Sequence, residues 1–155
     1  MLKRLKVVGG VVEEVDVPPE EEAAMLAEQQ AWEAGALARA KLARRAEINR
    51  ARDADENAGF TYLGKPFDSD ALAIKRLYGA AMAAQAAIAA GVPPGDIFTD
   101  WTCADGSIQP LTYAQAAGVI EAMAVVGNAL HIKARTLKAQ IEASSTVEEV
   151  SAIQW

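Results

Sequence analysis

The segment from position 113 to 143 constrains the fold more than any other part of the sequence. Apolar residues recur in this segment every three or four positions. In a helix this spacing places their side chains on one face, like the contact seam of a coiled coil. Thr112-Tyr113-Ala114-Gln115 matches a capping box, so the helix is expected to begin there. The seam residues alternate gaps of four and three: Ala116, Ile120, Met123, Gly127, Leu130, Ala134, Leu137 and Ile141.

A second helix with the same kind of seam is expected before it. Asp68 or Ser69 can cap this helix, and Gly91 and Pro93 end it. We expect the two seams to face each other, because small residues on both would allow close approach. The longer seam could instead pair with another copy of the protein, and the sequence leaves both arrangements open. The shorter seam consists of Ile74, Leu77, Ala81, Ala84 and Ile88.

Short hairpins and one terminal helix complete the predicted fold. Gly and Asp-Gly turns between strand-like runs are typical of hairpins. Thr146-Val147-Glu148-Glu149 is a second capping box and predicts a short last helix. The fold class is therefore mainly α with small β-hairpins (α+β). The hairpins are expected at residues 5–17 around Gly9-Gly10, at residues 60–67 around Leu63-Gly64, and at residues 97–111 around Asp105-Gly106.

Between the first two hairpins the sequence predicts one long helix rich in alanine and charge. Acidic residues at Glu20–Glu22 open it and basic residues follow in its second half, as the helix dipole favours. Helices of this composition are seldom stable alone, so we expect an arm that needs a partner. The chain thus divides into a hairpin (1–18), an arm helix (19–58) and an α+β domain (59–155). The expected partner-binding residues are Met25, Leu26, Trp32, Leu37, Leu42 and Ile48.

Charge and cysteine content exclude several classes of partner. The net charge of −6 is unfavourable for binding phosphate backbones or anionic membranes. Cys103 is the one cysteine, so an intrachain disulfide is excluded and a small buried group is expected. No segment is expected to span a membrane, since Gln85 and Pro93-Pro94 interrupt the best candidate.

The sequence contains little that suggests catalysis or metal binding. His131 stands alone in the middle of a helix, and a catalytic base needs an orienting partner and a nucleophile. Asp68 and Asp70 are better explained by capping and turns than by metal binding. The basic run from Arg39 to Arg52 has no interleaved aromatic residue, so a solvated helix face is preferred over nucleic-acid binding. We therefore expect no enzyme, no metal and no cofactor.

The three tryptophans are expected to differ in role. Trp101 begins a hairpin and Trp155 ends the sequence, and both are expected to join the core. Trp32 lies on the arm, where its own helix offers no cluster for it. An exposed tryptophan there is a candidate interface anchor.

Several pieces of fixed spacing resemble a known but uncharacterised family. The first piece is Gly59-Phe60-x-Tyr62-x-Gly64-Lys65-x-Phe67-Asp68-x-Asp70. Trp101-Thr102-x-Ala104-Asp105-Gly106-Ser107 and Leu111-Thr112 follow, and then Leu137-Lys138-x-x-Ile141-x-x-Ala143 with Thr146-x-Glu148-Glu149. In this order, over residues 46–155, they resemble a domain of unknown function found in tailed-phage proteins associated with tail fibres.

The resemblance implies a non-catalytic tail protein of a tailed bacteriophage. It would be a structural component of the fibre or baseplate region, or alternatively a chaperone that holds fibre subunits during assembly. The implied partners are phage tail-fibre or baseplate proteins. The implied location is the tail of the virion, after assembly in the cytoplasm of the bacterial host. The family offers no catalytic residue to carry over to this sequence.

Overall fold

A computed structural model describes residues 3–8 and 10–155 of the chain. Within these residues the fold has five helices and three separate two-stranded antiparallel sheets, which confirms the predicted fold class. The order is β1 (Lys3–Val8), β2 (Val11–Asp16), α1 (Pro19–Ala34), α2 (Ala36–Asn57), β3 (Phe60–Tyr62), β4 (Lys65–Phe67), α3 (Ala71–Ala89), β5 (Ile97–Thr102), β6 (Ile108–Thr112), α4 (Tyr113–Ala143) and α5 (Val147–Ala152).

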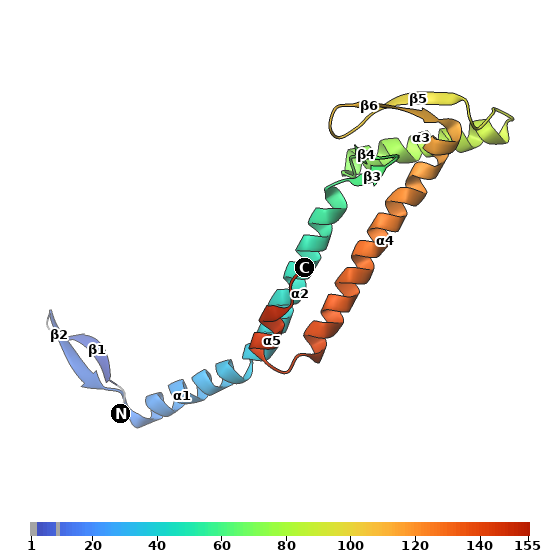
Figure 1. Ribbon diagram of the computed structural model, residues 1–155. Helices are drawn as coiled ribbons and strands as arrows, with labels where there is room; N and C mark the ends of the chain where they lie inside the picture. Colours follow the sequence, from blue (N-terminus) through green and yellow to red (C-terminus); the bar gives the residue numbers. More distant parts are fainter. Residues whose placement is uncertain (1–2, 9) are drawn as a thin grey trace.

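Helices α2 and α4 lie side by side and form the long body of the molecule (Figure 1). Helix α3 packs across the beginning of α4, with the β5–β6 hairpin beside it, and α5 packs on α2 at the opposite end. The β1–β2 hairpin and α1 extend away from this body (Figure 1). The protein is therefore an elongated body with a projecting N-terminal arm, which we define as residues 3–8 and 10–34.

The first half of α4 packs on α3 around a core that we call the α3 core. Both predicted capping boxes form, and the one at Thr112 and Gln115 starts α4 at the predicted residue. Phe67 lies at the centre of the aromatic group, stacked on Trp101 with ring centroids 6.2 Å apart. The prediction that the seams of α3 and α4 face each other is confirmed for this half. The buried residues are Phe60, Phe67, Leu77, Ala81, Ala84, Cys103, Leu111, Ala116 and Val119.

A glycine allows the β3–β4 hairpin to close on the end of α2. Gly59 has a φ of +98°, and a Cβ there would lie 2.5 Å from the backbone oxygen of Phe67. A side chain would therefore be excluded both by strain and by the neighbouring backbone. The glycine places Phe60 and Phe67 opposite each other in the register of the hairpin.

The second half of α4 packs on α2 and α5 around a separate core, which we call the α5 core. Its buried residues are Ile48, Ala134, Ile141 and Val150, with Leu37, Leu137 and Trp155 packed against them. The indole Nε1 of Trp155 donates a hydrogen bond to Asp55 Oδ2 at 2.7 Å. The last residue of the sequence is thus fixed against α2, as expected for a tryptophan of the core.

The prediction of one uninterrupted helix over 19–58 is wrong. The helix is divided at Gly35, and only its first half, α1, belongs to the projecting arm. The second half, α2, folds against α4 and α5 because Ile48 and Leu37 have apolar neighbours there. Alanine and charge dominate α2, yet Leu37 and Ile48 join a core, and Lys41 adds a hydrogen bond from its Nζ to the Glu142 carbonyl oxygen at 2.7 Å.

The N-terminal hairpin forms with the expected partners. Val8 pairs with Val11 and Val7 with Val12. Gly10 has a φ of +88°, which suits the tight turn. Gly9, the other half of the predicted turn, lies outside the described residues.

Helix α3 begins with a cap one residue later than expected. The Asp70 carboxylate accepts hydrogen bonds from the backbone N–H groups of Leu72 and Ala73, at 2.8 and 2.9 Å. The prediction of Asp68 or Ser69 as the cap is wrong, because the Ser69 hydroxyl is bonded instead to Gly59 and Glu56. The bond from Ala73, and next the bond from Leu72, lower the pKa of Asp70 below its ordinary value of 3.8.

The capping bonds of Asp70 give a stability that depends on pH. A carboxyl with a lowered pKa in the folded chain stabilises it above the unfolded pKa, and this contribution is lost as pH falls through the folded pKa. We expect Asp70→Asn to lower the melting temperature at neutral pH and to lower it less at about pH 3. Thermal unfolding of both proteins at the two pH values measures the difference. The same difference in melting temperature at both pH values would contradict capping by the charged carboxylate.

By length and composition α4 is, within the described chain, the one helix that could cross a membrane. On this criterion the best candidate is α4 and not the segment around Gln85, and the expectation that no segment spans a membrane stays a prediction. Only 11% of the most apolar 18-residue stretch of α4 is buried in the fold. The helix thus has more apolar surface than its two cores use.

Candidate functional site

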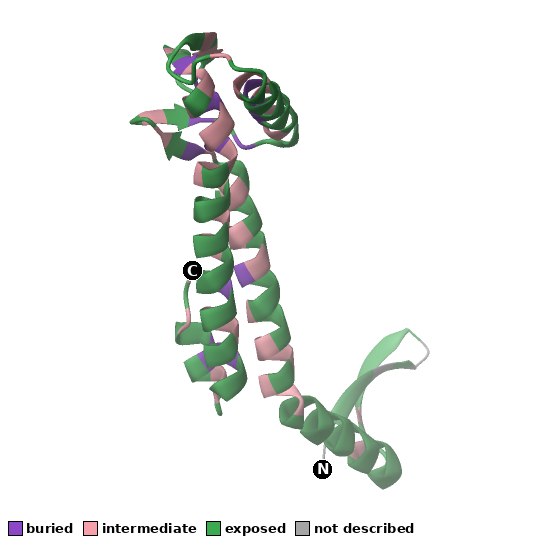
Figure 2. Ribbon diagram, turned by 90° about the vertical axis from the view of Figure 1, so that its right-hand side faces the viewer, coloured by how far each residue is buried: buried purple, intermediate pink, exposed green. Residues whose placement is uncertain are grey.

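The N-terminal arm has very little packing of its own. None of the residues of α1, all of which the structure describes, is buried, and Figure 2 shows most of the arm exposed. Val17, between β2 and α1, is buried, with 3% exposed. Arg4 Nη1 binds Glu21 at 2.6 and 2.9 Å and so connects the hairpin to α1. The exposed large apolar side chains of the arm, which we call the arm surface, are Leu5, Val7, Val11, Val12, Met25, Leu26 and Trp32.

An elbow joins the arm to the body at Gly35. A Cβ on Gly35 would lie 2.5 Å from Arg39 Nη1, so the guanidinium occupies the space that a side chain would need. From there Arg39 donates a hydrogen bond to the carbonyl oxygen of Trp32, at the C-terminal end of α1. The guanidinium also lies 3.5 Å from the centre of the Trp32 ring, a cation–π contact.

The elbow opens a shallow groove of about 580 Å³ on the arm side. Because Arg39 covers one face of Trp32, the indole is fixed in place while 65% of the residue remains exposed. A held, exposed tryptophan is well suited to a protein interface, since little side-chain entropy remains to be lost on binding. The groove is lined by Met25, Glu28, Gln29, Ala31, Trp32 and Arg39.

Gly35→Ala tests whether the missing side chain causes the elbow. We expect the Cβ to displace the Arg39 guanidinium and the two helices to join into a straighter rod. Small-angle X-ray scattering should then show a larger maximum dimension, and the fluorescence of Trp32 should change. Alanine is preferred over glycine inside a helix by about 1 kcal/mol, so stability should not fall.

Gly79→Ala is the matched control for the elbow. Gly79 also lies within a helix, α3, and a Cβ there would meet nothing within 4 Å. This variant should gain similar helix propensity and leave the scattering profile unchanged. Identical profiles for the wild-type protein and Gly35→Ala would show that the glycine does not set the bend.

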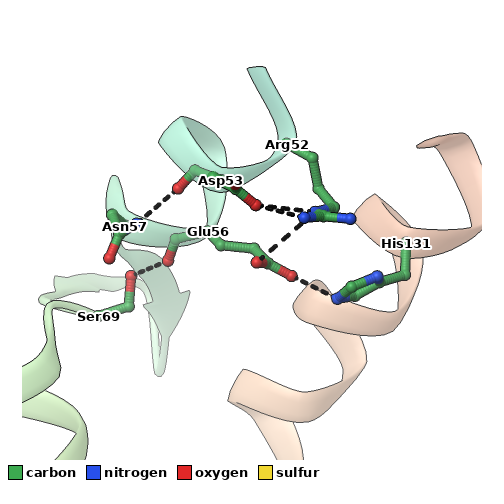
Figure 3. A network of polar contacts seen from close by, with 6 residues as sticks. All are labelled: Arg52, Asp53, Glu56, Asn57, Ser69 and His131. Atoms are coloured by element: carbon green, nitrogen blue, oxygen red, sulfur yellow. Dashed lines mark hydrogen bonds and ion pairs between the residues drawn. The ribbon is translucent and has the colours of Figure 1, made fainter. Parts of the chain in front are cut away.

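A polar network lies where the end of α2 meets α3 and α4 (Figure 3). His131 Nε2 lies 2.8 Å from Glu56 Oε1, and Arg52 Nε lies 3.9 Å from Glu56 Oε2. Asp53 binds the same guanidinium, and this hydrogen bond is the main cause that raises the pKa of Arg52. The network thus connects α2 to the middle of α4 through a single carboxylate, that of Glu56.

A cavity of about 380 Å³ opens beside this network. Glu56 and His131 belong to its lining, which contains both polar and apolar side chains. An imidazole beside a carboxylate is the pairing used by a catalytic base and its orienting group. However, the Ser69 hydroxyl of this network donates to the Glu56 carbonyl oxygen and accepts from the Gly59 N–H, so it is not directed at His131. The apolar lining comes from Phe60, Ile74, Tyr78, Met123, Val126 and Leu130.

The acidic residues considered for catalysis or metal binding are not brought together. Asp70 caps α3, and no hydrogen bond or ion pair joins Asp68, Asp70 and His131 among the described residues. Over the same part of the chain, no group of three or more His, Cys, Asp and Glu residues is placed to hold a metal ion. In this arrangement His131 and Glu56 connect two helices.

A family model described as a domain of unknown function (DUF4376) matches residues 39–154. The chain belongs to this family. The DUF4376 match begins within α2 and ends one residue before Trp155, so it contains the buried residues of both cores and excludes the projecting arm. No curated protein and no solved structure matches the chain.

Four of the six residues predicted to bind a partner are exposed, and two are not. Met25, Leu26 and Trp32 lie on the arm, and Leu42 lies on α2 facing solvent. The prediction is wrong for Leu37 and Ile48, which pack in the α5 core. They are on the faces of α2 that meet α4 and α5, where Ile48 is buried and Leu37 is partly buried.

The seam of α4 is divided between the α3 core and the α5 core, and it does not pack against α3 alone. Ile120 and Met123 pack against the α3 core, whereas Ala134, Leu137 and Ile141 belong to the α5 core. Gly127 and Leu130 line the cavity between these two cores. Helix α3 crosses only the first half of α4, so α2 and α5 take the rest of the seam.

Sequence reasoning missed the elbow and the partner of His131. The elbow had a usable signal, because a glycine inside a helical pattern is a frequent C-terminal cap or break. Glu56 and His131 are 75 positions apart, and nothing in their local sequence predicts that they meet.

Proposed function

We propose that this protein is a non-catalytic structural component of a bacteriophage tail, associated with tail fibres or the baseplate. In this proposal the DUF4376 domain is the rigid body, and the N-terminal arm attaches it to a neighbouring tail protein. The phage context comes from the resemblance of residues 46–155 to a tail-fibre-associated domain. The attachment role comes from the arm itself.

The observation that carries the proposal is the contrast between arm and body. The body has two cores with fully buried side chains, while α1 buries nothing and exposes Met25, Leu26 and Trp32. Most helical stability in proteins comes from tertiary packing, which α1 lacks because none of its residues is buried. A partner that covered this apolar surface would stabilise the arm and gain binding energy from it.

The charge of α1 indicates the kind of partner surface. Its sequence has five glutamates and neither lysine nor arginine. Glu21 binds Arg4, whereas Glu28 lines the groove beside Trp32. The surface that fits the arm is therefore apolar, to receive Trp32 and Met25, with basic residues around it.

The experiment is quantitative mass spectrometry of purified phage particles. We expect the protein in the particles at a fixed ratio to the fibre or baseplate proteins. Trp32→Glu should fold normally by circular dichroism and be strongly depleted from particles, because it places a charge at the centre of the arm surface. Met82→Glu is the matched control, since Met82 is exposed on α3 outside the arm and should be retained.

Two results would overturn the proposal. Absence of the wild-type protein from particles, together with binding to free fibre subunits, would identify an assembly chaperone instead. Equal incorporation of Trp32→Glu and the wild-type protein would remove the arm from the attachment role.

A further inference from the structure

Helix α4 has a second apolar face, opposite the face that packs in the two cores. Its residues again alternate gaps of four and three. They are separated from the buried seam by roughly half a turn, since each residue advances about 100° around a helix. This outer face consists of Val125, Ala129, Ile132, Thr136, Ala139 and Ala143.

The outer face is exposed although it carries no charge. Val125 is 62% and Ile132 55% exposed, and Figure 2 shows most of α4 exposed. Thr136 donates its hydroxyl hydrogen to the Ile132 carbonyl oxygen at 3.1 Å, so its polar group is already satisfied within the helix. At the start of α4 the Tyr62 hydroxyl, bonded to the Gln115 carbonyl oxygen, covers the equivalent positions. The free face therefore begins after Gly118.

We propose that this outer face binds the same face of a second copy of the chain, in antiparallel orientation. A face with gaps of three and four and small residues between Val125 and Ile132 has the pattern of a helix-pair seam. Such a face is self-complementary about a twofold axis, because Val125 of one helix can pack beside Ile132 of the other while the small Ala129 side chains let the two helices approach. The attachment role of the arm is not needed for this interaction.

The charges beside the face select the antiparallel orientation. Glu121 and Arg135 lie on the same flank of α4, fourteen residues apart, and neither forms an ion pair among the described residues. Their midpoint is residue 128, which is also the midpoint of α4. An antiparallel copy centred there places Glu121 level with Arg135 of the second copy, and the symmetry repeats the pair. The two free faces then overlap over residues 119–137. A parallel copy in register would place each charge level with an identical one.

This dimer would hold two arms far apart. The arm leaves the body at the end of α2 that lies away from α3 (Figure 1). Reversing the second copy sends its arm toward the opposite end of the pair. One dimer could then connect two neighbouring proteins, a geometry that a single copy does not offer.

Sedimentation equilibrium of the full chain tests the proposal. We expect a dimer for the wild-type protein, and monomers for Val125→Glu and Ile132→Glu with unchanged helical content by circular dichroism. Met82→Glu, an equally exposed apolar position on α3, should remain dimeric.

Charge exchange tests the orientation. Glu121→Arg and Arg135→Glu should each raise the dissociation constant by about tenfold or more, because each creates two like-charge pairs. The double variant, Glu121→Arg with Arg135→Glu, should restore wild-type affinity. Recovery requires that the two positions meet between chains, so a non-specific apolar contact would not produce it.

A monomeric wild-type protein at about 100 µM, well above the dissociation constant of a micromolar dimer, would overturn the proposal. A dimer that survives Val125→Glu and Ile132→Glu would also overturn it. Flotation with phosphatidylcholine vesicles tests for lipid binding. A monomeric wild-type protein that floats with the vesicles, when Val125→Glu does not, would assign the face to a lipid surface instead.

Discussion

Phe67→Ala should lower the free energy of unfolding by about 3–5 kcal/mol, the range for removing a buried aromatic side chain. Phe67 is 0% exposed, and as the last residue of β4 it joins the β3–β4 hairpin to Trp101 of β5. Its ring is 5.7 Å from that of Phe60, 5.6 Å from that of Tyr62 and 6.2 Å from that of Trp101. Alanine would leave a cavity that three rigid rings cannot easily fill.

Urea unfolding followed by circular dichroism measures this loss. Tyr78→Ala is the control, because Tyr78 is an aromatic residue exposed on α3, and alanine favours the helix there. Its change should be within about 0.5 kcal/mol. Similar small losses for both variants would mean that the hairpins are not held together through Phe67.

Local signals in the sequence predicted most of the secondary structure. The capping boxes at Thr112 and Thr146 each depend on a sequence of only four residues. The turns with glycine at a positive φ are equally local. Each such motif satisfies its own backbone hydrogen bonds. The strands and the starts of α4 and α5 could therefore be derived without knowing the tertiary fold.

The path of α2 could not be derived in the same way. Its buried face has few bulky residues, chiefly Leu37 and Ile48, and these resemble the equally spaced Leu26 of the exposed α1. What separates them is the elbow at Gly35, where an arginine four residues later occupies the space above the glycine. A pattern of apolar spacing does not contain this information, because the contacts that decide it are with α4 and α5.

The same limit applies to the candidate sites. The exposure of Trp32 could be predicted, because no apolar cluster surrounds it in its own helix. The meeting of Glu56 with His131 depends on how α2 lies against α4, and so it required the tertiary structure. The outer face of α4 was present in the sequence as a second row of gaps of three and four. It becomes informative only once the fold shows which row is buried.

Ile48→Ala should lower the free energy of unfolding of the isolated chain by about 2–5 kcal/mol. Ile48 is 2% exposed and packs in the α5 core. Leu42, on the same helix, is 72% exposed, so Leu42→Ala should change stability by less than about 0.5 kcal/mol. Urea unfolding of the two variants compares one aliphatic truncation inside the core with one outside it.

The pair of variants decides whether α2 belongs to the body or to the arm. If all of residues 19–58 formed an arm that required a partner, the isolated chain would tolerate both truncations equally, because neither side chain would be buried. The fold requires unequal losses. It also requires slow amide hydrogen exchange through Ala36–Asn57 and fast exchange through Pro19–Ala34, since only α2 has core contacts. Equal losses with uniformly fast exchange would mean that α2 belongs to the arm. Residues other than those of α2 would then have to bury Ala134 and Ile141.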